Sequence, residues 1–263
     1  MTICTAVRPA AGTATWTPRR RPALLGELLV VLCLLKVYDL ARAAADVRRT
    51  AALGHGRAIL HVEGLLRIGV EQAANVWTGD HRSLALAASN VYQYAHLPVT
   101  LGVLTLVWLR RPDLYRAARN ALVAINVCGL TVFLLFPVAP PRLLPGGGFV
   151  DVVSDAGLGT SHSGPIHADQ YGAMPSLHVA WAVWSTIVVL RLLAGRTGRQ
   201  LCWLYPLVVT AVVIVTANHY LLDAAAGALV ALAALDRPAL VSLLRRGWPA
   251  AMTQPAAPAV PAQ

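Results

Sequence analysis

Three polar motifs, each placed where an apolar stretch begins or ends, contain residue types that suit phosphoryl transfer. Arg142 follows two prolines, Ser176 and His178 lie in the run Met-Pro-Ser-Leu-His, and His219 precedes Asp223 by four residues. A guanidinium grips phosphate oxygens with parallel hydrogen bonds and stays charged at any relevant pH. A histidine beside a bound phosphate is held protonated and can deliver a proton to a departing alkoxide. Together the motifs offer a nucleophile, an acid and a cation.

The spacing of His219 and Asp223 places both side chains on one face of a helix. Asp223 is therefore expected to accept a hydrogen bond from one ring nitrogen of His219, which leaves the other nitrogen basic. A carboxylate at membrane depth costs about 2.5 to 3.5 kcal/mol on insertion scales, so Asp223 needs a partner there. A buried pair that only pins two helices together is the alternative interpretation.

Pro175 and Ser176 predict the start of a helix, since proline suits the first turn and serine offers a capping oxygen. Free backbone N–H groups at such a start, with the positive end of the helix dipole, form an anion site. His178 falls in this first turn. For His178 and Arg142 alike, the alternative is simple contact with lipid headgroups.

The composition indicates that these motifs are held by membrane helices. The 263 residues are 57% apolar and 13% charged, whereas soluble domains are about 25% charged. Six stretches approach the roughly 20 apolar residues that a spanning helix needs, and none resembles a strand. We therefore expect an all-α polytopic bundle of six transmembrane helices, at Ala23–Leu40, Leu84–Leu109, Ala121–Val138, Leu177–Leu193, Leu201–Ala217 and Tyr220–Leu235.

The net charge of +10 follows from arginines that cluster after alternate apolar stretches. By the positive-inside rule, both termini are cytoplasmic and all three motifs lie at the extracytoplasmic face, most simply of the plasma membrane. This topology explains the basic clusters without a nucleic-acid partner. The four scattered cysteines predict neither a disulfide framework nor a zinc ribbon.

The connection between the first two stretches predicts an amphipathic interfacial helix over residues 57–77. Its arginines are expected to touch lipid headgroups rather than substrate, and Glu63 is expected to pair with Arg67. The apolar face comprises Ile59, Val62, Leu66, Val70, Ala73 and Trp77, and the opposite face comprises Arg57, His61, Gly64, Arg67, Glu71 and Asn75.

Residues 23–240 are expected to form one domain, with an outer loop at 139–175. The N-terminal segment 1–22 and the Pro/Ala-rich tail 241–263 are expected to be disordered. Ala41-Arg42-Ala43 is similar to a signal-peptidase site, although the segment before it is long for a signal peptide, so an uncleaved anchor is preferred.

Other polar positions allow two interpretations each. Asn90, Gln93 and His96 either line a lipid cavity or bond a neighbouring helix, and the structural interpretation is preferred. His162, His167 and Asp169 have a spacing that suits a metal, but solvated loop histidines are the commoner case. No metal and no cofactor are expected.

The order of Arg142, then Pro-Ser-x-His, then His-x-x-x-Asp resembles the type 2 phosphatidic acid phosphatase superfamily. The variants Pro-Pro-Arg, Met-Pro-Ser-Leu-His and Asn-His-Tyr-x-x-Asp are more similar to its inositol phosphorylceramide synthase branch. The resemblance covers about residues 55–236. It implies a six-helix membrane enzyme in which His219 forms a phosphohistidine, Asp223 orients it, and His178 protonates the leaving group. It also implies that Arg142 and Ser176 hold the phosphate oxygens.

Three positions depart from the commoner pattern of that superfamily. Leu135 and Val213 stand where a lysine and an arginine are usual, and Leu177 stands where a glycine is usual. Two cationic contacts are thus missing, which suits a phosphodiester better than a phosphomonoester.

The sequence therefore predicts a membrane enzyme that cleaves or transfers a lipid-linked phosphate, with a lipid phosphate or phospholipid as substrate. Hydrolysis and transfer share their first half-reaction, so the acceptor is either water or an alcohol. A non-enzymatic transporter or structural membrane protein is the alternative of another class. That alternative predicts no vanadate inhibition and no phosphate on the protein.

Overall fold

The computed structural model describes residues 22–46, 48–158, 171–193 and 196–235, and within them the fold is all-α. The described residues form helices and loops, with one isolated parallel bridge between Val138 and Gly172. The helices are α1 (Leu24–Asp46), α2 (Arg49–Leu66), α3 (Glu71–Gly79), α4 (Arg82–Tyr94), α5 (His96–Arg110), α6 (Pro112–Leu135), the 3-10 turn η1 (Pro141–Leu143), α7 (Val152–Asp155), α8 (Leu177–Leu190), α9 (Arg196–Leu201), α10 (Leu204–Val215) and α11 (Leu221–Ala234).

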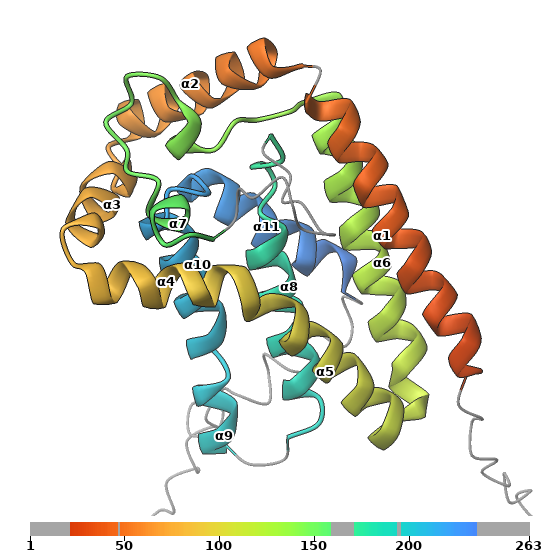
Figure 1. Cartoon of the computed structure of the whole chain (residues 1–263). Helices are drawn as coiled ribbons and strands as arrows, with labels where there is room; N and C mark the ends of the chain where they lie inside the picture. The colour runs from red at the N-terminus through yellow and green to blue at the C-terminus, as the bar shows by residue number, and fades with distance from the viewer. Residues whose placement is uncertain (1–21, 47, 159–170, 194–195, 236–263) are drawn as a thin grey trace, which may run out of the picture.

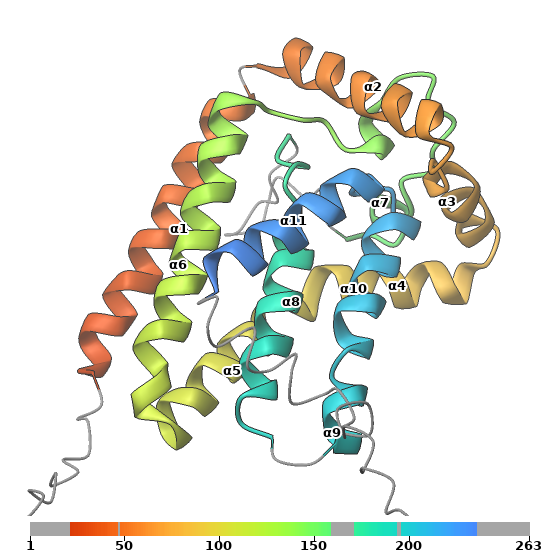
Figure 2. The same cartoon turned by 180° about the vertical axis from the view of Figure 1, so that it is seen from behind.

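Helix α8 lies at the centre of the bundle, with α5, α6, α10 and α11 packed around it (Figure 1). Its buried residues point in every direction, as expected for a helix that is apolar all round. Trp184 in the middle of α8 is fully buried, and its indole N–H donates to the carbonyl of Ala118 on α6 at 3.0 Å. Helix α1 runs along the outside of α6, where Glu27 pairs with Arg119 at 2.6 Å (Figure 2).

The six-span bundle expected from the sequence is not confirmed. Among the described residues, two helical segments are long and apolar enough to cross a bilayer, Pro112–Leu135 and Gly198–Val215. The 14-residue helices α8 and α11 reach about 21 Å at 1.5 Å per residue, less than the roughly 30 Å of a hydrocarbon core. Shorter apolar helices occupy the remaining predicted spans.

The predicted span Leu84–Leu109 is divided into two helices. Helix α4 ends at Tyr94, α5 begins at His96, and the chain changes direction between them (Figure 1). Pro98 has no N–H to donate to the carbonyl of Tyr94, so the helical bonding is interrupted at this place.

The single interfacial helix predicted over residues 57–77 is also two helices. Arg67 adopts a left-handed conformation with φ of 56° and ends α2, and α3 begins at Glu71. The predicted ion pair between Glu63 and Arg67 does not form, because the Glu63 carboxylate accepts from the backbone N–H of Leu222 instead.

The polarity of this segment is partly the reverse of the prediction. Arg57, His61 and Arg67 are exposed as expected, but Glu71 and Asn75 are fully buried. Five members of the predicted apolar face are exposed: Val62, Leu66, Val70, Ala73 and Trp77. The buried polar groups face the rest of the protein, where they bond to the backbone around the third motif.

Several predictions concern residues outside those described. These are the disordered N-terminus (1–22, of which only residue 22 is described), the tail 241–263, and the loop residues His162, His167 and Asp169. Helix α1 continues through Ala41-Arg42-Ala43. The described parts of the predicted outer loop 139–175 contain η1 and α7.

Candidate active site

His219 lies in the short connection between α10 and α11. The backbone N–H groups of Asn218 and His219 both donate to the carbonyl of Val213, at 3.1 and 3.2 Å, and close the end of α10. The N–H of Tyr220 donates to Asp223 Oδ2 at 3.1 Å and so begins α11. The imidazole is thereby held between two helix ends and is almost fully buried.

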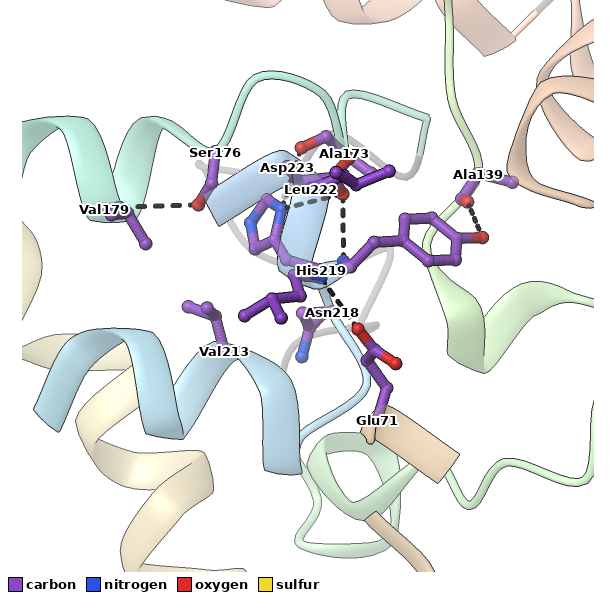
Figure 3. A network of polar contacts seen from close by, with 12 residues as sticks. Glu71, Ala139, Ala173, Ser176, Val179, Val213, Asn218, His219, Leu222 and Asp223 are labelled. Atoms are coloured by element: carbon purple, nitrogen blue, oxygen red, sulfur yellow. Dashed lines mark hydrogen bonds and ion pairs between the residues drawn. The ribbon is translucent and has the colours of Figure 1, made fainter. Parts of the chain in front are cut away.

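The nearest partner of His219 Nδ1 is a backbone carbonyl. Nδ1 lies 2.8 Å from Ala173 O and 3.6 Å from Asp223 Oδ2 (Figure 3). A carbonyl oxygen only accepts, so Nδ1 must carry the proton and Nε2 keeps its lone pair. The direct hydrogen bond expected between His219 and Asp223 is therefore replaced by one to Ala173 O, with the carboxylate just behind it.

His178 lies next to His219, with the two ring centroids 5.6 Å apart. The start of α8 is anchored on α11, since Ser176 N donates to Asp223 O at 3.0 Å. Gly227, one turn further along α11, lies directly against the carbonyl of Ser176. These backbone contacts bring the second and third motifs together.

Two residues of the preceding helices surround His178. The ring of Tyr92 stacks on it at 4.7 Å, and His96 meets it edge-on at 4.4 Å. His96 therefore lies beside the site, whereas Asn90 is exposed and donates to Leu86 O in its own helix. In the described part of the chain, the ring nitrogens of His178 form no hydrogen bond, so they remain available to a substrate.

The beginning of α8 offers backbone donors beside the two histidines. Ser176 is fully buried, and its Oγ accepts a long hydrogen bond of 3.4 Å from Val179 N. Within the residues described, the N–H groups of Leu177 and His178 have no partner. A phosphate seated here would meet free amides and the positive end of the dipole of α8.

Arg142 is fixed beside the third motif. Its backbone N–H donates to Ala217 O at 3.0 Å, and its Nε donates to Asn218 Oδ1 at 2.8 Å. Nη1 pairs with Asp151 Oδ2 at 2.9 Å, and the Arg142 side chain is 6% exposed. Nη2 forms no hydrogen bond within the described ranges. Asn218 and Asp151 are thus site residues that the sequence prediction missed.

Helices α2 and α3 also contribute polar groups that the sequence prediction missed. Asn75 Nδ2 donates to Val215 O at 2.9 Å, just before the third motif. Glu71 Oε1 and Glu63 Oε1 accept from the N–H groups of Leu221 and Leu222, just after it. Burial, with the neighbouring Glu71 and Asp223, raises the pKa of Glu63 to about 7.

The structure explains one of the three departures from the usual pattern. Leu177 fits because it packs against Gly129 of α6, where a Cβ would come 2.6 Å from Leu177 Cδ2. Val213 is fully buried and Leu135 is 70% exposed, so neither position supplies a cation. In the described part of the site, Arg142 is the cation that contacts the motifs.

No group of three or more His, Cys, Asp or Glu among the described residues could hold a metal ion. The family model of the PAP2 superfamily matches residues 57–236, a range that includes all three motifs together with α3 and the second half of α2. Comparisons with curated proteins and with solved structures gave no match.

Proposed function

Since the chain belongs to the PAP2 superfamily, we propose that it cleaves a lipid-linked phosphate through a phosphohistidine on His219. The observation that carries the proposal is which ring nitrogen of His219 holds the proton. Ala173 O fixes the proton on Nδ1, which leaves the Nε2 lone pair for attack, and His178 lies beside it.

In the first half-reaction, Nε2 of His219 attacks phosphorus and the bond from phosphorus to the leaving oxygen breaks. Protonated His178 gives its proton to that oxygen, so the lipid or headgroup leaves as a neutral alcohol. In the second half-reaction, His178 takes a proton from the acceptor as the acceptor oxygen attacks phosphorus. The bond between phosphorus and Nε2 then breaks, and both histidines return to their starting states.

The phosphate oxygens are expected to bind between Arg142 and the start of α8. Nη2 of Arg142 and the amides of Leu177 and His178 supply donors. Such donors, fixed before substrate arrives, stabilise the charge that develops in the transition state. The Asp223 carboxylate, 3.6 Å from Nδ1, stabilises the positive charge that His219 acquires as it attacks.

A membrane location is supported by the two long apolar helical segments and by the apolar outer surface. Large apolar side chains are exposed along α1 and α10, among them Leu25, Leu32, Leu204, Leu207 and Val208. Large apolar side chains that are exposed along a helix typically mark contact with lipid or with a partner. We propose an integral protein of the plasma membrane with cytoplasmic termini and an extracytoplasmic site.

Headgroup transfer is a second candidate, similar to the inositol phosphorylceramide synthase branch. Asp151 balances the charge of Arg142 at 2.9 Å, and neither Leu135 nor Val213 supplies a second cation. A phosphodiester carries one negative charge and needs less compensation than a phosphomonoester with nearly two. This charge balance favours a phospholipid donor and an alcohol acceptor.

The test uses the full chain in lipid nanodiscs, supplied either with phosphatidic acid or with a phospholipid diester and free lipid alcohols. Mass spectrometry of the products identifies both donor and acceptor. We expect turnover by the parent protein, inhibition by vanadate, and loss of turnover in His219→Ala. Product release by His219→Ala at the parent rate would exclude the mechanism. A parent protein that is inactive on every donor would favour the transporter alternative.

A further inference from the structure

Two glutamates from separate helices hold the first turn of α11. Glu71 Oε1 accepts from Leu221 N at 2.8 Å, and Glu63 Oε1 accepts from Leu222 N at 2.7 Å. These are among the N–H groups that an α-helix cannot satisfy internally. This turn begins two residues after His219, and Figure 3 shows the Glu71 carboxylate beside the connection that carries the histidine.

The second oxygen of each glutamate lacks a donor. Both side chains are fully buried, and neither Glu63 Oε2 nor Glu71 Oε2 has a hydrogen-bond partner among the described residues. The two amides from which they accept belong to consecutive residues, Leu221 and Leu222, which brings the two carboxyl groups side by side. Two ionised carboxylates only accept, so that contact requires a proton on one of them.

If the proposed function holds, His219 must face the bound phosphate. We propose that Glu63 and Glu71 share one proton and act together as positioning residues, which hold the start of α11 so that His219 faces the phosphate. The proton supplies the donor that both buried Oε2 atoms lack. Leaving such oxygens without a donor in a buried site would destabilise the fold.

The surrounding charges favour retention of this proton. Glu63 of α2 faces Glu71 of α3, Asp223 of α11 and the Tyr220 hydroxyl. A fully ionised set would place three carboxylates behind a site that must receive a phosphate anion. The raised pKa of Glu63, about 7, is consistent with a proton kept near neutral pH.

Glu63 and Glu71 also give the starts of α8 and α11 different roles. The first amides of α11 are occupied by protein carboxyl groups, whereas the amides of Leu177 and His178 at the start of α8 are free in the described structure. The dipole of α11 is therefore used to fix His219 and Asp223. The dipole of α8 remains available to bind the substrate phosphate.

The variants Glu63→Gln and Glu71→Gln imitate the protonated member, since an amide accepts from the backbone N–H and donates to its partner. The variants Glu63→Ala and Glu71→Ala remove the acceptor. Asp80→Asn is the matched control, because Asp80 is an exposed carboxylate just after α3. All variants are assayed in nanodiscs for kcat and KM with lipid phosphate, and for thermal unfolding between pH 5 and pH 8.

We expect each Gln variant to keep kcat within about threefold and each Ala variant to lose about 100-fold, as for a small displacement of a reacting group, with little change in KM. The unfolding midpoint of the parent relative to Glu63→Gln should fall as pH rises, because only the parent loses a proton. Ala variants with parental kcat, or a pH-independent midpoint difference, would overturn the proposal.

Failure of this proposal can be distinguished from failure of the proposed function, because His219→Ala tests the chemistry and the glutamate variants test the positioning role. If the parent or His219→Ala shows that no phosphohistidine chemistry occurs, the proposed function fails, and the pH-dependent midpoint still reports on the shared proton. If His219→Ala is inactive while Glu63→Ala and Glu71→Ala turn over normally, the proposed function stands and the positioning role is refuted. Asp80→Asn should match the parent in every assay.

Discussion

Substitution of Gly227 by alanine tests the contact that brings the second and third motifs together. A Cβ at this position would overlap Ser176 O and would lie 3.0 Å from Ser176 C and 3.3 Å from Ser176 N. These are backbone atoms of the residue that starts α8, so no flexible side chain can give way. Helix α11 must therefore move away from α8 by an amount on the order of 1 Å.

The movement of α11 should lower both the stability and the kcat of the protein. Overpacking at a buried contact costs about 1 to 3 kcal/mol of stability. The displacement also lengthens the 3.0 Å hydrogen bond from Ser176 N to Asp223 O and separates His178 from His219. A displacement of this size is expected to reduce kcat by about 100-fold.

The assay compares kcat and thermal unfolding of Gly227→Ala with those of Gly102→Ala in the same nanodiscs. Gly102 lies in α5, and a Cβ there would meet nothing within 4 Å. The control should change stability by less than about 1 kcal/mol and keep parental kcat. A Gly227→Ala protein with parental kcat would refute the idea that this helix contact sets the distance between the histidines.

Three further predictions concern Arg142, Asp151 and Glu63. Arg142→Lys should lower kcat/KM by about 10- to 100-fold in steady-state assays, because an ammonium cannot bond Asn218, Asp151 and phosphate in one plane; unchanged kcat/KM would contradict this. Asp151→Asn should raise kcat/KM for a phosphomonoester relative to a phosphodiester, since the charge of Arg142 is no longer balanced; an unchanged ratio would argue against the charge argument. With the pKa of Glu63 at about 7 when folded and about 4.3 when unfolded, the folded state retains the proton longer. Its stability should therefore fall by about 3 kcal/mol as pH rises from about 4 to 7, and Glu63→Gln should lack this slope in unfolding measurements.

The sequence was sufficient to predict the helical class and the identity of the three motifs. Apolar stretches of helical length determine the first, and residue types at fixed spacing determine the second. The proximity of His178 and His219 was expected from their common position at one end of the apolar stretches, and their rings lie 5.6 Å apart. The roles assigned to them remain proposals.

The partners of His219 were harder to predict, because they depend on backbone atoms. Ala173 contributes only its carbonyl, and no side-chain type marks that contact in a sequence. Helical spacing predicts a hydrogen bond between His219 and Asp223, but His219 lies in the connection before α11, so the two residues do not share a helix face. The carboxylate still lies 3.6 Å from Nδ1, although the spacing does not decide which acceptor is nearest.

The error over α2 and α3 has a different physical origin. A periodic polar stripe shows that one helix face differs from the other, but not whether that face meets water or a buried backbone. Glu63, Glu71 and Asn75 face inward because the amides and carbonyls around His219 need partners. The break at Arg67 was also not predicted from the sequence. A single residue in a left-handed conformation does not change the spacing of the apolar residues on either side of it.

The central claim is that His219 takes up the phosphate, and a rapid-quench experiment tests it most directly. The full chain in nanodiscs is mixed with lipid phosphate, quenched at alkaline pH to preserve phosphohistidine, digested and analysed by mass spectrometry. We predict an acid-labile phosphate on His219 that appears before the product and is absent from His219→Ala. Phosphate on another residue, or turnover by the parent with no phosphorylated peptide at any quench time, would contradict the account.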